Sequence, residues 1–209
     1  MNKIITFEGV DGCGKTTQIN LLSGYLNSLN KENIIVREPG GTCISERIRE
    51  ILLDEDNSIN SVTETLLFLS SRSQLVNEII KKQMDNSKFI LFDRFIDSTI
   101  AYQGYGRGLD IEKLKSLNDF ATDNLKPDLT FILDIELSES LRRINTNSMD
   151  RMEKSGKSFL KRVISGYKAI ALKNQSRYKL IDCNNKKPND ISLEIIYHLD
   201  KFYKGHEYE

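Results

Sequence analysis

Several features that would place this protein in a specialised class are scarce or missing in its sequence. Only three cysteines occur among 209 residues, at scattered positions without a C-x-x-C spacing, so neither a disulfide framework nor a zinc site is indicated. The 30 basic and 30 acidic side chains cancel, which leaves no overall positive field to attract a nucleic acid polymer or an anionic membrane. No hydrophobic run approaches the roughly 20 residues of a membrane span, and none forms a signal peptide. We therefore expect a soluble, cytoplasmic protein without nucleic acid or membrane partners.

Short β-branched and aromatic runs alternate along the chain with longer stretches of helical periodicity. The runs predict strands at 3–8, 34–37, 89–93, 129–134 and 178–182. The periodicity predicts helices at 14–29, 43–53, 61–85, 111–121, 137–146, 156–174 and 189–203. Near-continuous apolar strands separated by helices are typical of a parallel sheet buried on both faces, where ligands bind beyond the carboxyl ends of the strands. No linker or repeat interrupts the pattern, so we expect one α/β domain over residues 1–209.

The segment EGVDGCGKTTQ follows the first predicted strand and opens the first predicted helix. It contains the P-loop pattern G-x-x-x-x-G-K-[ST], with Gly9, Gly14, Lys15 and Thr16 at the fixed positions. Glycines let successive backbone N–H groups turn towards a phosphate, and the helix presents its positive end to the same oxygens. Lys15 would bridge the β- and γ-phosphates of ATP, and the Thr16 hydroxyl would ligate Mg²⁺. The ATP-binding residues predicted in this loop are Gly9, Val10, Asp11, Gly12, Cys13, Gly14, Lys15, Thr16 and Thr17.

The rest of the sequence favours a small-molecule kinase over a GTPase. The guanine-binding pattern N-K-x-D is not matched, because NKKP at 185–188 has a proline in place of the aspartate. FDRF at 92–95 ends a buried strand, where Arg94 could clamp an acceptor phosphate with its planar fork. Asp93 could hold a magnesium-bound water or orient Arg94, and a structural ion pair at the strand end is the alternative interpretation.

Three further segments carry side chains suited to a second substrate. Phe68 and Arg72 lie four residues apart on one helical face, where they could contact a base, or could be a core phenylalanine beside a surface arginine. The segment 97–108 begins as a helical turn that the glycines at 104, 106 and 108 then break. Its hydrogen-bonding residues include Ser98, Thr99, Tyr102 and Gln103. The polar segment at about 145–157 is typical of a lid over donor phosphates, or of a solvated charged turn.

Taken together, these segments resemble the thymidylate kinase family from about residue 3 to about residue 183. The motifs that carry the resemblance are FEGVDGCGKTTQ, REPGGT, FLSSRSQ, DRFIDSTIAYQG, KPDLTFILD and DRME, in this order. The resemblance implies an α/β fold of the P-loop nucleoside-monophosphate-kinase type, a three-layer sandwich with a five-stranded parallel sheet flanked by helices. It also implies transfer of the γ-phosphate of ATP to dTMP, giving dTDP for dTTP biosynthesis, with Mg²⁺ as cofactor and in a homodimer.

The resemblance further implies roles for residues around the acceptor. Phe68 would stack on thymine while Arg72 donates to its exocyclic oxygen, and Arg94 would grip the acceptor phosphate. Pro39 would shape the space for the 5-methyl group, and Tyr102 would pack under the deoxyribose. The implied substrate-binding residues are Asp11, Glu38, Pro39, Phe68, Arg72, Arg94, Ser98, Thr99, Tyr102, Gln103 and Tyr167.

Members of the family differ in the position of the arginine that stabilises the transition state. Here the P-loop position after the acidic residue is Gly12 and the lid contains Arg151, so the sequence looks like the bacterial arrangement. Arg143 would assist by binding ATP, and Ile164 stands where many members carry another arginine. The implied catalytic residues are Lys15, Asp93, Arg94 and Arg151, and the implied metal ligands are Thr16 and Asp93.

Two alternative functions stay open. A P-loop kinase for another deoxynucleotide or a deoxynucleoside would keep the same loop, although a nucleoside offers no phosphate to Arg94. A non-catalytic module that binds ATP as a conformational ligand would need no Arg151. The resemblance to the thymidylate kinase family also implies that residues 182–186 lie near adenine. Cys13, between two loop glycines, raises a separate hypothesis that thiol reagents inactivate the protein.

Overall fold

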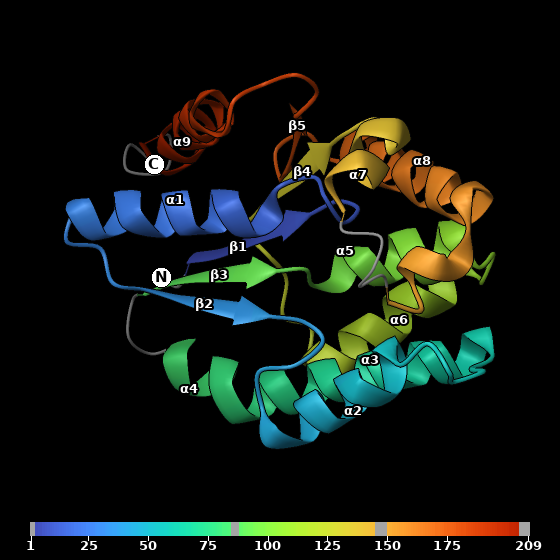
Figure 1. Cartoon of the computed structure of the whole chain (residues 1–209). Helices are drawn as coiled ribbons and strands as arrows, with labels where there is room; N and C mark the ends of the chain where they lie inside the picture. The colour runs from blue at the N-terminus through green and yellow to red at the C-terminus, as the bar shows by residue number, and fades with distance from the viewer. Residues whose placement is uncertain (1–2, 85–87, 145–149, 205–209) are drawn as a thin grey trace.

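The computed structural model describes residues 3–84, 88–144 and 150–204, and it confirms the predicted α/β architecture. The described residues form one parallel sheet in the order β2-β3-β1-β4-β5 (Figure 1). Its strands are β1 (Lys3–Glu8), β2 (Asn33–Arg37), β3 (Phe89–Asp93), β4 (Leu129–Asp134) and β5 (Tyr178–Asp182). In the central strand Phe7 pairs with Asp93 on one side and with Phe131 on the other. The end of β1 and the end of β3 therefore reach the same edge of the sheet, side by side.

Helices cover both faces of this sheet. α1 (Lys15–Ser28) and α9 (Pro188–Lys204) contact each other on one face, which is the upper one in Figure 1. α2 (Cys43–Leu53), α3 (Ser61–Leu75) and α6 (Ile111–Thr122) belong to the layer on the opposite side. The elements described between β4 and β5 are α7 (Leu137–Arg143), η5 (Glu153–Ser155) and α8 (Lys157–Lys173). The described helices include none that is long and apolar enough to cross a membrane.

Side-chain caps explain where several helices begin. Thr42 accepts a hydrogen bond from the Ser45 N–H at the start of α2, and Asn60 accepts from two N–H groups at the start of α3. Asp110 caps α6 in the same way. Such side chains satisfy N–H groups that the helix itself leaves without acceptors. α1 differs because Gly14, which precedes it, has no side chain to offer.

Two helical segments differ from the predictions. The predicted helix at 61–85 is α3 followed by a π-helical turn, η1 (Val76–Ile80), and by α4 (Lys81–Gln83). The prediction that glycines at 104, 106 and 108 break the helical turn is wrong at Gly104 only. α5 (Ile96–Thr99) and η3 (Ile100–Gly106) form one helical stretch that ends at Gly106, and Gly108, with a φ of 79°, lies beyond its end. A Cβ at Gly106 would lie 2.6 Å from the Phe159 ring, so this glycine also permits close packing of α8.

Candidate active site

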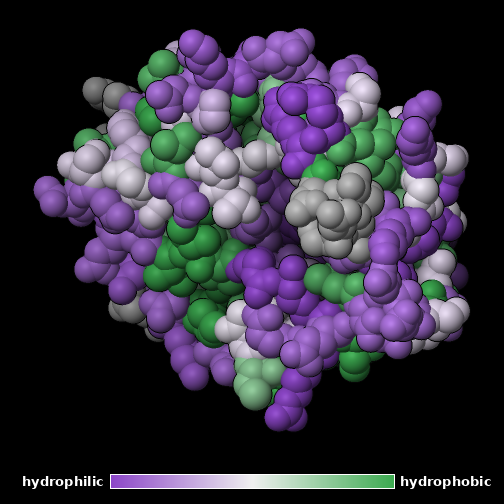
Figure 2. All heavy atoms as spheres, viewed as in Figure 1, coloured by the Kyte–Doolittle hydropathy of each residue, from purple (hydrophilic) through white to green (hydrophobic). Residues whose placement is uncertain are grey.

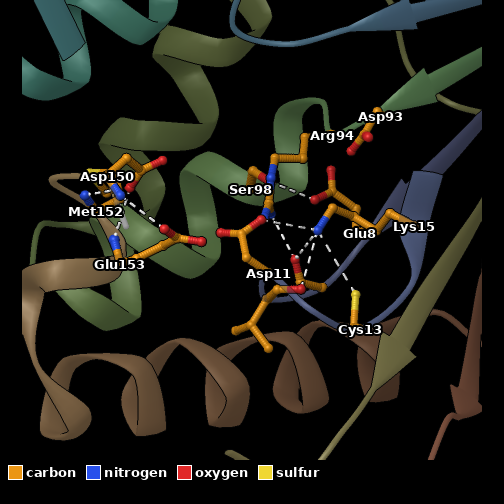
Figure 3. A network of polar contacts seen from close by, with 12 residues as sticks. Glu8, Asp11, Cys13, Lys15, Asp93, Arg94, Ser98, Asp150, Met152 and Glu153 are labelled. Carbon is orange, nitrogen blue, oxygen red and sulfur yellow. Dashed lines mark hydrogen bonds and ion pairs between the residues drawn. The ribbon is translucent and has the colours of Figure 1, made fainter. Parts of the chain in front are cut away.

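The chain between β1 and α1 curls around the side-chain amine of Lys15 (Figure 3). Lys15 Nζ donates to the carbonyl oxygens of Gly9 and Val10, at 3.2 Å each, and lies 3.4 Å from Asp11 Oδ1. Gly9 has a φ of 139°, and a Cβ there would lie 2.6 Å from the Leu133 carbonyl oxygen. The loop therefore needs glycine at this position. The first N–H groups of α1 face the same space and suit an anion.

A cleft of about 660 Å³ opens in front of this loop. In Figure 2 the surface is hollowed near its centre, and mainly hydrophilic side chains surround the hollow. Of the predicted ATP-binding residues, those at 11–17 and Arg143 line the cleft, whereas Gly9 and Val10 contribute only their carbonyl groups to Lys15. From the segment expected near adenine, Lys186 lines the cleft. The remaining lining residues are Gln18, Arg37, Glu38, Arg49, Asp93, Arg94, Pro188 and Ile191.

The predicted metal ligands lie together at the edge of this cleft. The Thr16 hydroxyl donates to Asp93 Oδ2 at 3.2 Å, although the two residues are 77 positions apart. Mg²⁺ prefers oxygen ligands and is commonly held by one or two protein groups together with phosphates and water. A hydroxyl and a carboxylate beside a phosphate loop fit that donor set. The described residues contain no group of three or more His, Cys, Asp or Glu side chains that could hold a metal ion.

Arg94 connects the strand end with the phosphate loop. Its Nη2 donates to Asp11 Oδ1 at 2.6 Å and its Nη1 donates to the Gly9 carbonyl at 2.7 Å. Its backbone has a φ of 68°, a left-handed conformation that is uncommon for arginine and recurs at functional sites. Burial opposes ionisation of Asp11, but the charges of Arg94 and Lys15 outweigh it and hold the pKa of Asp11 well below its usual range. The loop thus carries a fixed negative charge between two cations.

A smaller cavity of about 100 Å³ adjoins the cleft. The two share four lining residues, which are Asp11, Glu38, Arg49 and Arg94. The other residues around the smaller cavity are Pro39, Leu53, Phe68, Arg72, Ser98, Thr99, Tyr102, Gln103, Asp150 and Met152. The predicted acceptor residues from five separate segments are thereby brought together. Tyr167 is the exception, because it lines neither cavity and instead approaches Arg94 Nη1 at 3.3 Å.

Arg72 is buried, so the interpretation of residues 68 and 72 as a core phenylalanine beside a surface arginine is wrong. Its side chain is only 2% exposed, while Phe68 is half-buried on the wall of the smaller cavity. Arg72 donates to Glu38 Oε2 at 2.7 Å, to Thr99 Oγ1 at 2.7 Å, to Asn118 and to the Phe95 carbonyl. A guanidinium has five N–H donors, so these acceptors leave one N–H on Nη2 for another partner.

Glu8, the last residue of β1, lies behind Arg94 and is fully buried (Figure 3). Its carboxylate accepts from the Phe95 N–H at 2.8 Å, from Ser98 Oγ at 2.6 Å and from Tyr167 Oη at 2.9 Å. Burial, aided by the nearby Asp97, raises the pKa of Glu8 from 4.5 to about 7 against the effect of these donors. Glu8 therefore fixes the segment that carries Arg94, although it lines neither cavity.

Comparisons with known proteins agree with this arrangement. The sequence model of a family described as thymidylate kinase matches residues 7–195. The chain belongs to the thymidylate kinase family. It is 47% identical to a thymidylate kinase of Thermosipho africanus, over 91% of this chain and 94% of the relative. It is 46% identical to a thymidylate kinase of Prochlorococcus marinus strain NATL1A, over 97% of this chain and 98% of the relative. The crystal structure of a thymidylate kinase from Ehrlichia chaffeensis superposes with a TM-score of 0.79 at 37% identity, covering 95% of this chain and 98% of that one.

One residue that the family resemblance assigns to catalysis lies away from the phosphate loop in this structure. Arg151 was expected to face the donor phosphates, but it lines neither cavity. Its Nη1 donates to Glu64 Oε2 at 2.7 Å and its Nε donates to the Leu52 carbonyl at 2.8 Å. Glu64 is fully buried and needs cations around it, so it holds both Arg107 and Arg151. Residues 145–149 of the lid predicted at about 145–157 lie outside the described residues.

The hypothesis of a reactive thiol at Cys13 conflicts with its surroundings in this family member. Cys13 is 1% exposed, and burial raises the pKa of its thiol. A protonated, inaccessible thiol is a poor nucleophile. Cys43, at the start of α2, is the exposed cysteine among the described residues.

Arg49 is a lining residue that the sequence reasoning missed. It borders both cavities from α2, and its Nη1 donates to the Pro39 carbonyl at 3.0 Å. In the sequence Arg49 belongs to the segment ERIRE, which is typical of a charged, solvent-exposed helix surface and does not indicate a binding site. The position becomes recognisable once α2 is placed beside the Glu38–Pro39 segment.

Proposed function

We propose that this protein transfers the γ-phosphoryl group of ATP to dTMP, giving ADP and dTDP. The observation that carries the proposal is the meeting of two cavities at Arg94 and Asp11, one in front of the P-loop and one lined by the predicted thymidine contacts. A donor and an acceptor bound there would have their phosphates side by side, and holding two reactants in this way removes much of the entropic barrier. A cytoplasmic location, where both nucleotides are available, is part of the proposal.

The donor side supplies positive charge and fixed N–H groups. Lys15 and the start of α1 would hold the β- and γ-phosphates of ATP, and Arg143 lies at the rim of the same cleft. Thr16 and Asp93 would hold Mg²⁺, which neutralises phosphate charge when bound. We propose that the phosphoryl group passes directly from ATP to dTMP, without a covalent intermediate on the protein. The residues then act by positioning the two nucleotides and by neutralising charge.

On the acceptor side, each group of dTMP would meet a residue of matching chemistry. The half-buried Phe68 ring would stack on thymine, and the remaining N–H of Arg72 would donate to the exocyclic oxygen of the base. Pro39 and Tyr102 would bound the 5-methyl group and the deoxyribose. Arg94 would take the phosphate, since its fork already lies between the two cavities.

The role proposed for Arg151 requires a change of partner. Its guanidinium would have to leave Glu64 to reach the transferred phosphoryl group, and Glu64 would keep Arg107 and Gln103 as donors. We retain Arg151 as the transition-state arginine, in a single domain with a lid near 145–157.

The test compares ADP release from ATP and Mg²⁺ with dTMP, dUMP, thymidine, dCMP and dGMP as acceptors. Fast turnover with dTMP and slower turnover with dUMP is the expected result. Turnover with thymidine but not dTMP would assign the protein to the nucleoside kinases and remove the role of Arg94. Binding of ATP without turnover on any acceptor would support a non-catalytic module. The Arg94→Lys variant should raise KM for dTMP more than KM for ATP, because lysine lacks the planar fork that would hold the acceptor phosphate.

We also propose a homodimer, formed through the outer surface of α3 and α6. This surface exposes Leu66, Leu117 and Phe120, and the Phe120 side chain is 88% exposed. Large exposed apolar patches mark interaction surfaces, and a two-fold dimer would bury this patch against its own copy. Sedimentation should show a dimer for the wild type and a monomer for Phe120→Asp. Leu193→Asp, on the opposite layer, is the matched control and should stay dimeric.

A further inference from the structure

A third cavity, of about 190 Å³, lies outside the candidate active site. It is bounded by α5, α6, the end of α8 and the start of β5. No residue of its lining borders either of the two cavities described above. Its volume corresponds to roughly six water molecules at about 30 Å³ each, which suits a small anion and not a whole nucleotide.

The lining of this cavity is rich in cations. Its lining carries Lys115, Lys126, Lys173 and Arg177 against two carboxylates, Asp97 and Asp119. With Glu112, which pairs with Lys115, the four cations face three carboxylates, an excess of one positive charge in a chain of zero net charge. Lys126 pairs with Asp119 and Lys115 pairs with Glu112, but all these side chains are well exposed. Exposed ion pairs contribute little to stability, so an incoming anion can recruit both lysines.

Arg177 provides a second, independent observation. Its Nη2 pairs with the buried Asp97, but its Nε is buried and has no acceptor among the described residues. A buried N–H without an acceptor is unfavourable and is rare in folded proteins. The Arg177 side chain is 18% exposed, so an anion in the cavity would bring oxygens to the accessible N–H groups of the guanidinium and not to the buried Nε. A guanidinium binds phosphate oxygens in a fork geometry.

The cavity is connected to the proposed acceptor site by hydrogen bonds. Asn118, on its wall, accepts from Arg72 and donates to the Ile96 carbonyl at 3.1 Å. Arg72 in turn holds Glu38 and Thr99 at the acceptor cavity. A ligand that displaces Asn118 changes the placement of Arg72, and linkage between two sites acts in both directions.

We propose that this cavity is a second binding site, for a small phosphate-bearing anion, and that its occupancy changes the affinity for dTMP through Asn118 and Arg72. Binding of the anion is independent of the proposed kinase activity, whereas the coupling rests on dTMP being the acceptor.

The experiment uses pyrophosphate as the probe and the full-length protein saturated with ADP and dTMP, so that the P-loop is occupied. Isothermal titration should show one saturable pyrophosphate site. The variant Lys126→Gln/Lys173→Gln should bind pyrophosphate about tenfold more weakly or worse, because two charge-assisted contacts are removed. Lys161→Gln, an exposed lysine elsewhere on α8, is the matched control and should bind like the wild type. Inorganic phosphate, titrated in parallel, should bind more weakly than pyrophosphate.

Absence of saturable binding to the wild type, or equal binding to the cavity variant, overturns the proposed site. For the coupling, the dissociation constant of dTMP is measured with ADP present, with and without pyrophosphate. A change of about twofold or more in the wild type, absent from the cavity variant, is expected. An unchanged dissociation constant overturns the coupling, and failure to bind dTMP at all contradicts the proposed function and leaves the anion site as a separate result.

Discussion

The buried carboxyl of Glu8 allows a prediction whose size follows from the structure. Its pKa is about 7 in the folded protein because burial, aided by Asp97, outweighs the Ser98 hydroxyl, the Arg94 charge and the Phe95 N–H, whereas an ordinary glutamate has a pKa of 4.5. The difference of roughly 2.5 pH units corresponds to between about 3 and 4 kcal/mol, at about 1.4 kcal/mol per unit. This is a large fraction of the stability of a typical domain.

The sign follows from proton binding. Between about pH 4.5 and pH 7 the folded protein keeps a proton on Glu8 that the unfolded chain has released, so stability falls as the pH rises. Glu8→Gln removes this titration and keeps the shape of the side chain. Its amide can donate to the Ser98 and Tyr167 hydroxyls, which also accept hydrogen bonds. The variant should therefore become more stable relative to the wild type as the pH rises, by about 1.4 kcal/mol per unit up to about pH 7.

The measurement is urea unfolding of both proteins between about pH 5 and pH 8, with the difference in unfolding free energy plotted against pH. Glu139→Gln serves as the control, because its neighbours Arg142 and Arg143 lower the pKa of Glu139 to about 2 and it stays ionised throughout this range. The control difference should not vary with pH. If the Glu8→Gln difference is equally flat, Glu8 ionises like an exposed glutamate and the burial argument is refuted.

Three further predictions concern the proposed chemistry. Arg151→Ala should lower kcat by about 10³-fold or more, whereas Arg142→Ala, at an exposed position, is the control and should not. A kcat of Arg151→Ala within about tenfold of wild type would show that Arg151 does not act in the transition state. A thiol reagent should label Cys43 and spare the buried Cys13, as read by mass spectrometry of the native protein, and protection of a labelled Cys13 by ATP would contradict this. Thr16→Ala should raise the Mg²⁺ concentration for half-maximal activity about tenfold, measured by Mg²⁺ titration, while Thr16→Ser should stay close to wild type.

Features set by short stretches of sequence could be predicted accurately. The five strands lie within one residue of their predicted ranges. The apolar runs of β1, β3 and β4 are almost entirely buried, whereas the edge strands β2 and β5 are only partly buried. The break predicted at Gly104 was wrong, because the helical stretch continues to Gly106 and a glycine can either end a helix or admit a neighbouring one. Only the position of Phe159, on α8, shows that Gly106 admits its neighbour.

In the candidate site, too, residues of one continuous segment could be predicted, whereas residues that depend on distant contacts could not. The P-loop could be predicted because its glycines, Lys15 and Thr16 act through the backbone of one continuous segment. Arg49 could not, because its role depends on α2 lying beside the carbonyl of Pro39. The burial of Arg72 depends likewise on Glu38, which is 34 positions away.

The sequence by itself determined which segments form strands and helices, where the phosphate loop lies and to which family the protein belongs. Each of these is encoded in local patterns and their spacing. Only the tertiary structure decided which partner each charged side chain takes. Arg151 pairs with Glu64 of α3, 87 positions away, because a fully buried carboxylate must be surrounded by donors. The fold brings those donors from η3, from Arg107 directly after it and from the segment before η5. Ion pairs of this kind depend on burial, and burial exists only once the chain has folded.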